Sequence, residues 1–157
     1  MASGKHHVLT SLVLSPVAAG AAWFLTEKDL MNTLLVGLGC LSGVVISPDL
    51  DLSTRTISER AVLRQSLGLG YLWIAIWYPY GKLFKHRGVS HAPVLGTLTR
   101  IIYLFIVAFL VQLAVQYFRQ PEFTLEPYIF AYWPALILFV SGLLVSDLGH
   151  WLLDFIK

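Results

Sequence analysis

Long apolar stretches alternate with short polar clusters along this chain, and the charged residues fall mainly in the clusters. A helix needs about 20 apolar residues to cross a bilayer, with a range of about 17–25. Backbone groups in lipid need internal hydrogen bonds, and the stretches lack the alternation of strands, so helices are predicted. Four stretches are long enough to cross: about Val8 to Leu25, Leu30 to Ser47, Val94 to Phe118 and Tyr128 to Val145.

A fifth apolar segment, SLGLGYLWIAIWYPYGKL at 66–83, is shorter and contains Pro79 near its end. Its tryptophans and tyrosines are typical of the boundary between membrane and water. We expect it to lie on the membrane or to dip partly into it. The sequence therefore predicts an all-α integral membrane bundle of about four transmembrane helices. An interfacial aromatic helix lies between the second and third, and residues 1–157 form one domain.

The composition supports this class. The chain has 157 residues, of which 57% are hydrophobic and 13% are charged, with a mean hydropathy of +0.71. A soluble domain has about 45–50% apolar and about 25% charged residues. The net charge of +2 is too small to favour nucleic acid as a partner. Cys40, as the single cysteine, cannot form an intramolecular disulfide and is expected to be a packed thiol.

The distribution of basic residues predicts an orientation. Four crossings place both termini and the connector 48–93 on one face of the membrane. That face holds Lys5, Arg55, Arg60, Arg64, Lys82, Lys85, Arg87 and Lys157, with Arg100 near the end of the third predicted helix, whereas the other holds only Lys28 and Arg119. An excess of lysine and arginine marks the cytoplasmic side. Five crossings would divide these charges more evenly and are the weaker alternative.

Four polar clusters fall on this same predicted face. They are GKHH at 4–7, SPDLDLS at 47–53, HRGVSH at 86–91 and SDLGHWLLD at 146–154. Together they contain every histidine of the chain and every aspartate except Asp29. This convergence is what a ligand site requires.

The spacing within the clusters suits metal ligands. On a helix, Asp147, His150 and Asp154 project from one stripe, because they are three and four residues apart. Pro48 disfavours helical geometry at the residue before it, so Asp49 and Asp51 are expected in a turn.

The histidines His86 and His91 would diverge by about 140° on a regular helix. Gly88 lets the chain turn between them, so HRGVSH is interpreted as a loop that leads into the third membrane helix. Arg87 lies between these histidines and could hold an anionic oxygen. Its alternative role is that of a basic residue at the cytoplasmic side.

A cation would offset the cost of placing carboxylates close together near lipid. Imidazole and carboxylate ligands suit zinc, and also manganese and iron. The clusters offer more ligands than one tetrahedral ion needs, so two or more divalent ions are predicted. Taken singly, a PDLD turn or an HxxxD pair is common without a metal; only their combination on one face favours one.

The same motifs, with the run WYPYGKLFKHRGVSHAPVLGTLTRIIYL, resemble an uncharacterised family of small membrane proteins that is described as metal-binding. The resemblance extends over essentially the whole chain. More distantly, the chain is similar to YdjM-type inner-membrane metal-dependent hydrolases, which are grouped with the zinc-dependent phospholipase C and nuclease class. The resemblance implies His7 rather than His6 as a ligand. The full implied set is His7, Asp49, Asp51, His86, His91, His150 and Asp154, and Asp147 matches the closer family alone.

The predicted function is a metal-dependent hydrolase that acts on a phosphoester or lipid-like substrate at the cytoplasmic membrane face. In this hypothesis Arg87 stabilises negative charge, and Asp147, or one of the paired aspartates, accepts a proton. The alternative is a non-enzymatic, metal-stabilised scaffold or accessory subunit of a membrane complex. Whether the chain is an enzyme stays open at this point. Membrane lipids and a membrane protein are the partners considered.

Overall fold

The computed structural model describes residues 4–51, 69–84, 88–118 and 122–156, and every regular element in these ranges is a helix. The predicted all-α class is therefore confirmed for this part of the chain. The elements are α1 (Gly4–Leu25), α2 (Leu30–Ser42), the 3-10 helix η1 (Pro48–Asp51), α4 (Leu69–Leu83), the 3-10 helix η2 (Val89–His91), α5 (Pro93–Phe118) and α6 (Glu126–Ile156).

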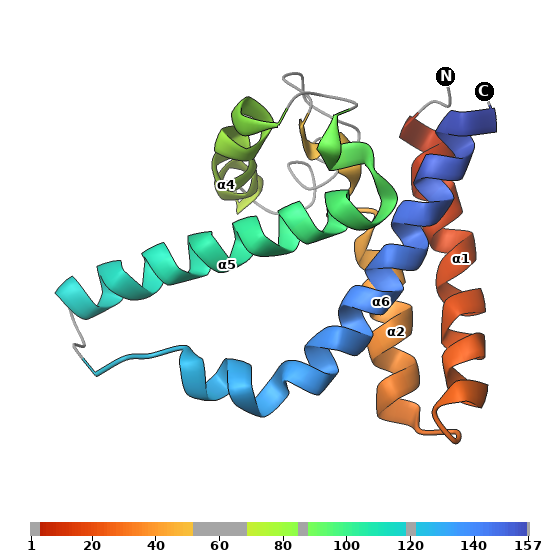
Figure 1. Cartoon of the computed structure of the whole chain (residues 1–157), viewed down its shortest axis with the longest axis horizontal. Coiled ribbons are helices and arrows are strands. Elements are labelled where there is room, and N and C mark those ends of the chain that lie inside the picture. Colours follow the sequence, from red (N-terminus) through yellow and green to blue (C-terminus); the bar gives the residue numbers. More distant parts are fainter. Residues whose placement is uncertain (1–3, 52–68, 85–87, 119–121, 157) are drawn as a thin grey trace.

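Helices α1, α2 and the C-terminal half of α6 form a bundle, with α2 running back alongside α1 (Figure 1). Small residues allow α2 and α6 to approach closely. A Cβ atom on Gly39 would collide with the carbonyl oxygen of Phe139, and one on Gly142 would collide with that of Val36. The hydroxyls of Ser11 and Ser146 add a buried hydrogen bond of 2.7 Å between α1 and α6. The bundle is thus held by backbone proximity as well as by its apolar core.

Within the described ranges, three helices are long and apolar enough to cross a membrane: Lys5–Leu25, Pro93–Phe118 and Glu126–Ile156. The second predicted span, from Leu30 to Ser47, is shorter than expected, because α2 has 13 residues and ends at Ser42. At 1.5 Å per residue it is about 20 Å long, against about 30 Å for the hydrocarbon layer. Gly43 caps this end through its amide, which donates to the carbonyls of Cys40 and Leu41. A crossing by α2 therefore stays a prediction.

The predicted interfacial segment contains α4, which packs against the first half of α5. Four of the side chains between them are buried and form an apolar cluster: Leu50, Trp77, Tyr80 and Tyr103. The Tyr103 hydroxyl donates to the carbonyl oxygen of Ile76, which ties α5 to α4. Because Leu50 belongs to η1, this cluster also connects α4 to the segment that follows α2. An interfacial position of α4 stays a prediction.

Helix α5 runs away from the bundle, and α6 starts alongside α5 and bends back toward α2 (Figure 1). Pro134 lies inside α6, where it removes one helical hydrogen bond and favours such a bend. Many large apolar side chains on these helices face outward, among them Phe109 and Phe130. Such a surface could contact lipid.

The topology brings four segments to one end of the bundle. The start of α1 and the end of α6 lie side by side there, with η1 and η2 next to them (Figure 1). The turn between α1 and α2, where Glu27 and Lys28 have positive φ angles, lies at the opposite end (Figure 1). The fold therefore brings five of the predicted ligands that lie in the described residues to a single end of the bundle: His7, Asp49, His91, His150 and Asp154.

Candidate metal centre

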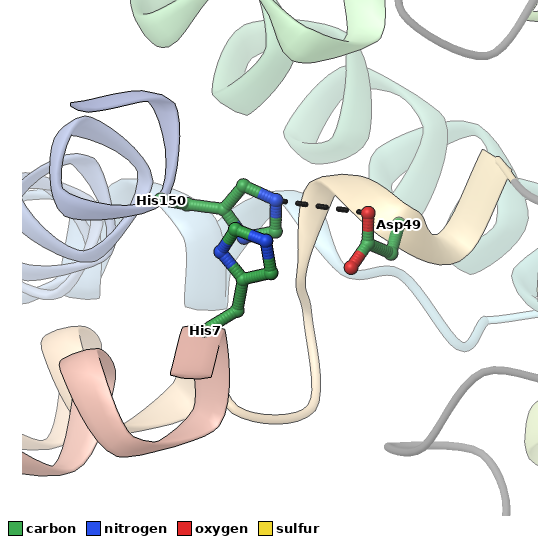
Figure 2. Close-up of side chains that lie close together, drawn as sticks. All are labelled: His7, Asp49 and His150. Carbon is green, nitrogen blue, oxygen red and sulfur yellow. Dashed lines mark ion pairs between the residues drawn. The ribbon is translucent and has the colours of Figure 1, made fainter. Parts of the chain in front are cut away.

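His7 and His150 form the centre of the cluster. The two rings stack with their centroids 3.6 Å apart and their planes within 11° (Figure 2). Both residues are buried, at 7% and 5% exposure, whereas His6 is exposed. A Cβ atom on Gly149 would lie 2.4 Å from Cδ1 of Leu14 on α1, so the two helices are in close contact beside these histidines. The start of α1 and the end of α6 are thereby fixed side by side.

Asp154 lies one turn beyond His150 on α6 and faces both histidines. Its Oδ2 atom is 3.6 Å from Nε2 of His150, and its Oδ1 atom is 3.4 Å from Nε2 of His7. The predicted helical pair is therefore formed, and it includes His7 from α1.

Asp49 approaches from the other side, on η1. Its Oδ1 atom is 3.6 Å from Nε2 of His150 (Figure 2) and 3.5 Å from Nε2 of His91. The His91 ring meets the His150 ring at 77°, with centroids 5.8 Å apart. His91 lies in η2, which folds tightly onto α5 because Gly96 leaves no side chain against the carbonyl of Ser90.

The histidines strongly influence the charge of Asp49. Burial on its own raises the pKa of this carboxyl group, but the neighbouring imidazoles of His150, His91 and His7 together outweigh burial and bring the pKa well below its ordinary value. Asp49 is therefore ionised at neutral pH, as a metal ligand must be. The side chains of Asp49 and Asp154 keep 21% and 28% of their surface exposed, so the carboxylates give solvent access to the cluster.

The donor set and the distances fit a divalent cation. Ligand atoms of His7, Asp49 and His150 all lie within 4.8 Å of one another, and so do those of His91, His150 and Asp154. Two ligands bound about 2.0–2.1 Å from a tetrahedral ion are about 3.3–3.4 Å apart. The separations above are similar to this value and longer than ordinary hydrogen bonds. His7 Nδ1 and His150 Nε2 are also buried without a hydrogen-bond partner.

Three predicted site residues cannot be placed in the cluster. His86 and Arg87 lie outside the described residues, as does the side chain of Asp51, whose backbone completes η1. The remaining five predicted ligands are brought together, and metal binding by these side chains stays a prediction.

Asp147 has a different environment from the one predicted for a catalytic residue. It is 2% exposed and forms an ion pair with Arg100, while the Thr97 hydroxyl donates to the same carboxylate oxygen. Sequence reasoning counted Arg100 only as a basic residue near a helix end. The available signal was an arginine inside the apolar stretch that begins at Val94, since such residues usually have a buried partner.

A comparison with protein families places this cluster in context. The family model described as "Uncharacterized metal-binding protein (DUF2227)" matches residues 2–157. The chain belongs to this family. The metal-binding resemblance predicted from the motifs is therefore confirmed, and the donor cluster gives a structural location where this family property could reside.

One relative supports no finer assignment. An uncharacterized protein of Aquifex aeolicus (strain VF5) is 38% identical over 69 residues, which cover 43% of each chain. The chain thus aligns with less than half the length of this curated relative. No solved structure is significantly similar to the chain. The more distant resemblance to YdjM-type hydrolases and to the phospholipase C class stays a prediction from motifs.

Proposed function

We propose that this protein is a membrane-embedded divalent-metal protein with its metal centre at the end of the bundle where the termini meet. His7, Asp49, His91, His150 and Asp154 would hold the metal. The observation that carries the proposal is the convergence of these five ligand groups from four separate segments. Zinc is the first candidate, with manganese and iron as alternatives.

More than one ion fits the arrangement. Each carboxylate lies between two histidines, Asp49 between His91 and His150, and Asp154 between His7 and His150. Carboxylates commonly bridge two cations. The lone pair of an imidazole nitrogen lies in the plane of its ring, so the lone pairs of two stacked, parallel rings lie in two separate planes and do not converge on one point. His7 and His150 would therefore serve two neighbouring ions more readily than one.

For the reaction, we propose hydrolysis of a phosphoester in a lipid-like substrate. A bound divalent cation would polarise a phosphoryl oxygen and lower the pKa of water. The chain's own contribution is to keep Asp49 ionised and partly exposed, so that water and a substrate oxygen can reach the centre. The motif position of Arg87 beside His86 suits an anionic oxygen. Membrane lipids at the cytoplasmic face are the proposed source of substrate.

A metal-stabilised scaffold is the second candidate. The ligands come from the start of α1, from η1, from η2 and from the end of α6. An ion at this point would fasten four chain segments that are distant in sequence. The two functions differ in access, because a catalytic ion keeps a coordination position open to water.

Elemental analysis of the purified protein in detergent tests the metal proposal. We expect at least one divalent ion per chain. Asp49→Asn should lower metal affinity by about tenfold or more, because it removes the charge of a direct ligand. Replacing a residue that only supports a ligand already costs about 10–100-fold in affinity. Glu126→Gln is the control, since Glu126 is an exposed carboxylate at the start of α6. A wild-type protein that binds no divalent metal would contradict the proposal.

Activity distinguishes the two candidates. The metal-loaded protein, reconstituted in phospholipid vesicles, should release phosphate-containing products, and Asp49→Asn should abolish the release. Full metal occupancy without any hydrolysis of phospholipids or simple phosphodiesters would favour the scaffold.

A further inference from the structure

Arg100 is a fully buried charge near the start of α5, with 0% of its surface exposed. All of its three guanidinium nitrogens donate hydrogen bonds. Nε donates to the carbonyl of Gly96 at 3.1 Å, Nη1 donates to the carbonyl of Ile46 at 2.6 Å, and Nη2 donates to Oδ2 of Asp147. A buried charge is costly unless such partners satisfy it.

These acceptors lie on the segments that carry the proposed ligands. Ile46 is three residues before Asp49, and Asp147 is one helical turn before His150. Gly96 is the residue whose missing side chain lets η2 pack onto α5, beside His91. One guanidinium group thus connects the segment between α2 and η1, the first turns of α5 and the C-terminal half of α6.

Thr97 strengthens the connection between α5 and α6. Its hydroxyl group donates to the same Asp147 oxygen that Arg100 contacts, and Thr97 is 1% exposed. Thr97 and Arg100, which are three residues apart on the same face of α5, therefore both donate to the carboxylate of Asp147 on α6. Asp147 Oδ1 is buried and has no hydrogen-bond partner, so the strong contacts of this residue all involve Oδ2.

We infer that Arg100 and Asp147 are a positioning pair, which sets the separation of Asp49, His91 and His150 without binding the metal or substrate. This inference rests on the proposed metal centre at those residues. It gives Asp147 a different role from the catalytic one that its sequence position predicted. The planar fork of arginine is essential here, because lysine cannot donate to three acceptors in these directions.

The test compares Arg100→Met with Gln112→Leu in the full-length protein. Gln112 is another buried polar residue of α5, 4% exposed, whose Oε1 atom accepts from the amide of Leu125. Its loss removes a partly buried hydrogen bond, at a position 12 residues further along α5 than Arg100. Cobalt titration followed by visible absorption reports both affinity and coordination geometry. We expect about 10–100-fold weaker cobalt binding and an altered spectrum in Arg100→Met, and neither change in Gln112→Leu.

A metal-independent measurement separates this inference from the proposed function. Amide hydrogen exchange in metal-free protein should accelerate at 44–50 and 89–96 in Arg100→Met, and not in Gln112→Leu. If wild-type protein binds no cobalt, the metal proposal fails while the exchange data still decide the positioning role.

Three further variants keep the test decisive. If Arg100→Met does not fold, the double variant Arg100→Met/Asp147→Leu removes both charges and avoids leaving one unpaired. It should fold and still show faster exchange and weaker cobalt binding. Arg100→Lys should recover only part of the affinity. Unchanged exchange and an unchanged cobalt spectrum in the folded variants would overturn the inference, as would an Asp147→Asn variant that loses hydrolysis while keeping both.

Discussion

His6 and His7 are neighbours in sequence, yet only His7 points into the cluster. His7 stacks on His150 and its Nε2 atom lies 3.4 Å from Asp154, while His6 is exposed. On a helix, successive side chains differ in direction by about 100°, so they cannot both face one site. The two residues form a natural matched pair for an experiment.

We expect His7→Gln to weaken zinc binding by about tenfold or more, because a ligand has a larger effect than an outer-shell residue. His6→Gln should leave zinc binding within about twofold of wild type, because exposed substitutions usually change free energies by no more than about 0.5 kcal/mol. Competition with a chromogenic chelator measures both affinities. Equal losses in the two variants would argue against the ligand role of His7.

At the residue scale, the sequence predicted the five clustered histidine and aspartate side chains but did not predict the buried Arg100–Asp147 pair beside them. Five histidine and aspartate side chains could be brought together by counting helices and their directions. The Arg100–Asp147 pair could not, because Arg100 bonds to a carbonyl group 54 residues away. Such a contact depends on how α5 packs on α2 and α6, which hydropathy does not encode.

Among the elements, α2 shows where apolar run length is a poor guide. The apolar sequence continues to Ile46, but the helix ends at Ser42 and the chain turns toward η1. The signals for this end were Gly43 and Pro48, which are weak in a segment that contains other glycines. The early end of α2 brings Asp49 level with His150.

The close packing of α2 against α6 gives a prediction for this pair of helices. Gly142→Ala should destabilise the protein by about 1–3 kcal/mol, because the added methyl group would collide with the carbonyl of Val36. Gly20→Ala is the control, since nothing lies within 4 Å of its added Cβ. That change should be neutral or stabilising by up to about 1 kcal/mol, given the helix propensity of alanine.

Thermal unfolding in detergent, followed by circular dichroism, measures the two glycine variants. Metal affinity should fall in Gly142→Ala as well, because the separation of Asp49 and His150 depends on the contact of α2 with α6. Equal stability of Gly142→Ala and Gly20→Ala would show that the close approach is not required.

For the whole molecule, the sequence predicted that both termini share one side, and the structure places the start of α1 and the end of α6 side by side (Figure 1). The turn between α1 and α2 lies at the other end of the bundle. Three helices of the described ranges reach membrane length. An even number of crossings is needed to place both termini on one face, so the fourth crossing has to be made by the short α2. The membrane orientation follows from charge distribution alone and stays a prediction.

Labelling of introduced cysteines tests this orientation with two exposed lysines at opposite ends, Lys5 at the start of α1 and Lys28 in the α1–α2 turn. The native Cys40 is buried at 0% exposure and should contribute little background. In intact bacterial spheroplasts, a membrane-impermeant maleimide should label Lys28→Cys and should reach Lys5→Cys only after permeabilisation. The excess of basic residues near the termini would then face the cytoplasm, together with the metal centre.

Labelling of Lys5→Cys alone from outside would show that the orientation is inverted and would move the proposed substrate to the opposite face. Labelling of both from outside would mean that the α1–α2 pair does not cross the bilayer.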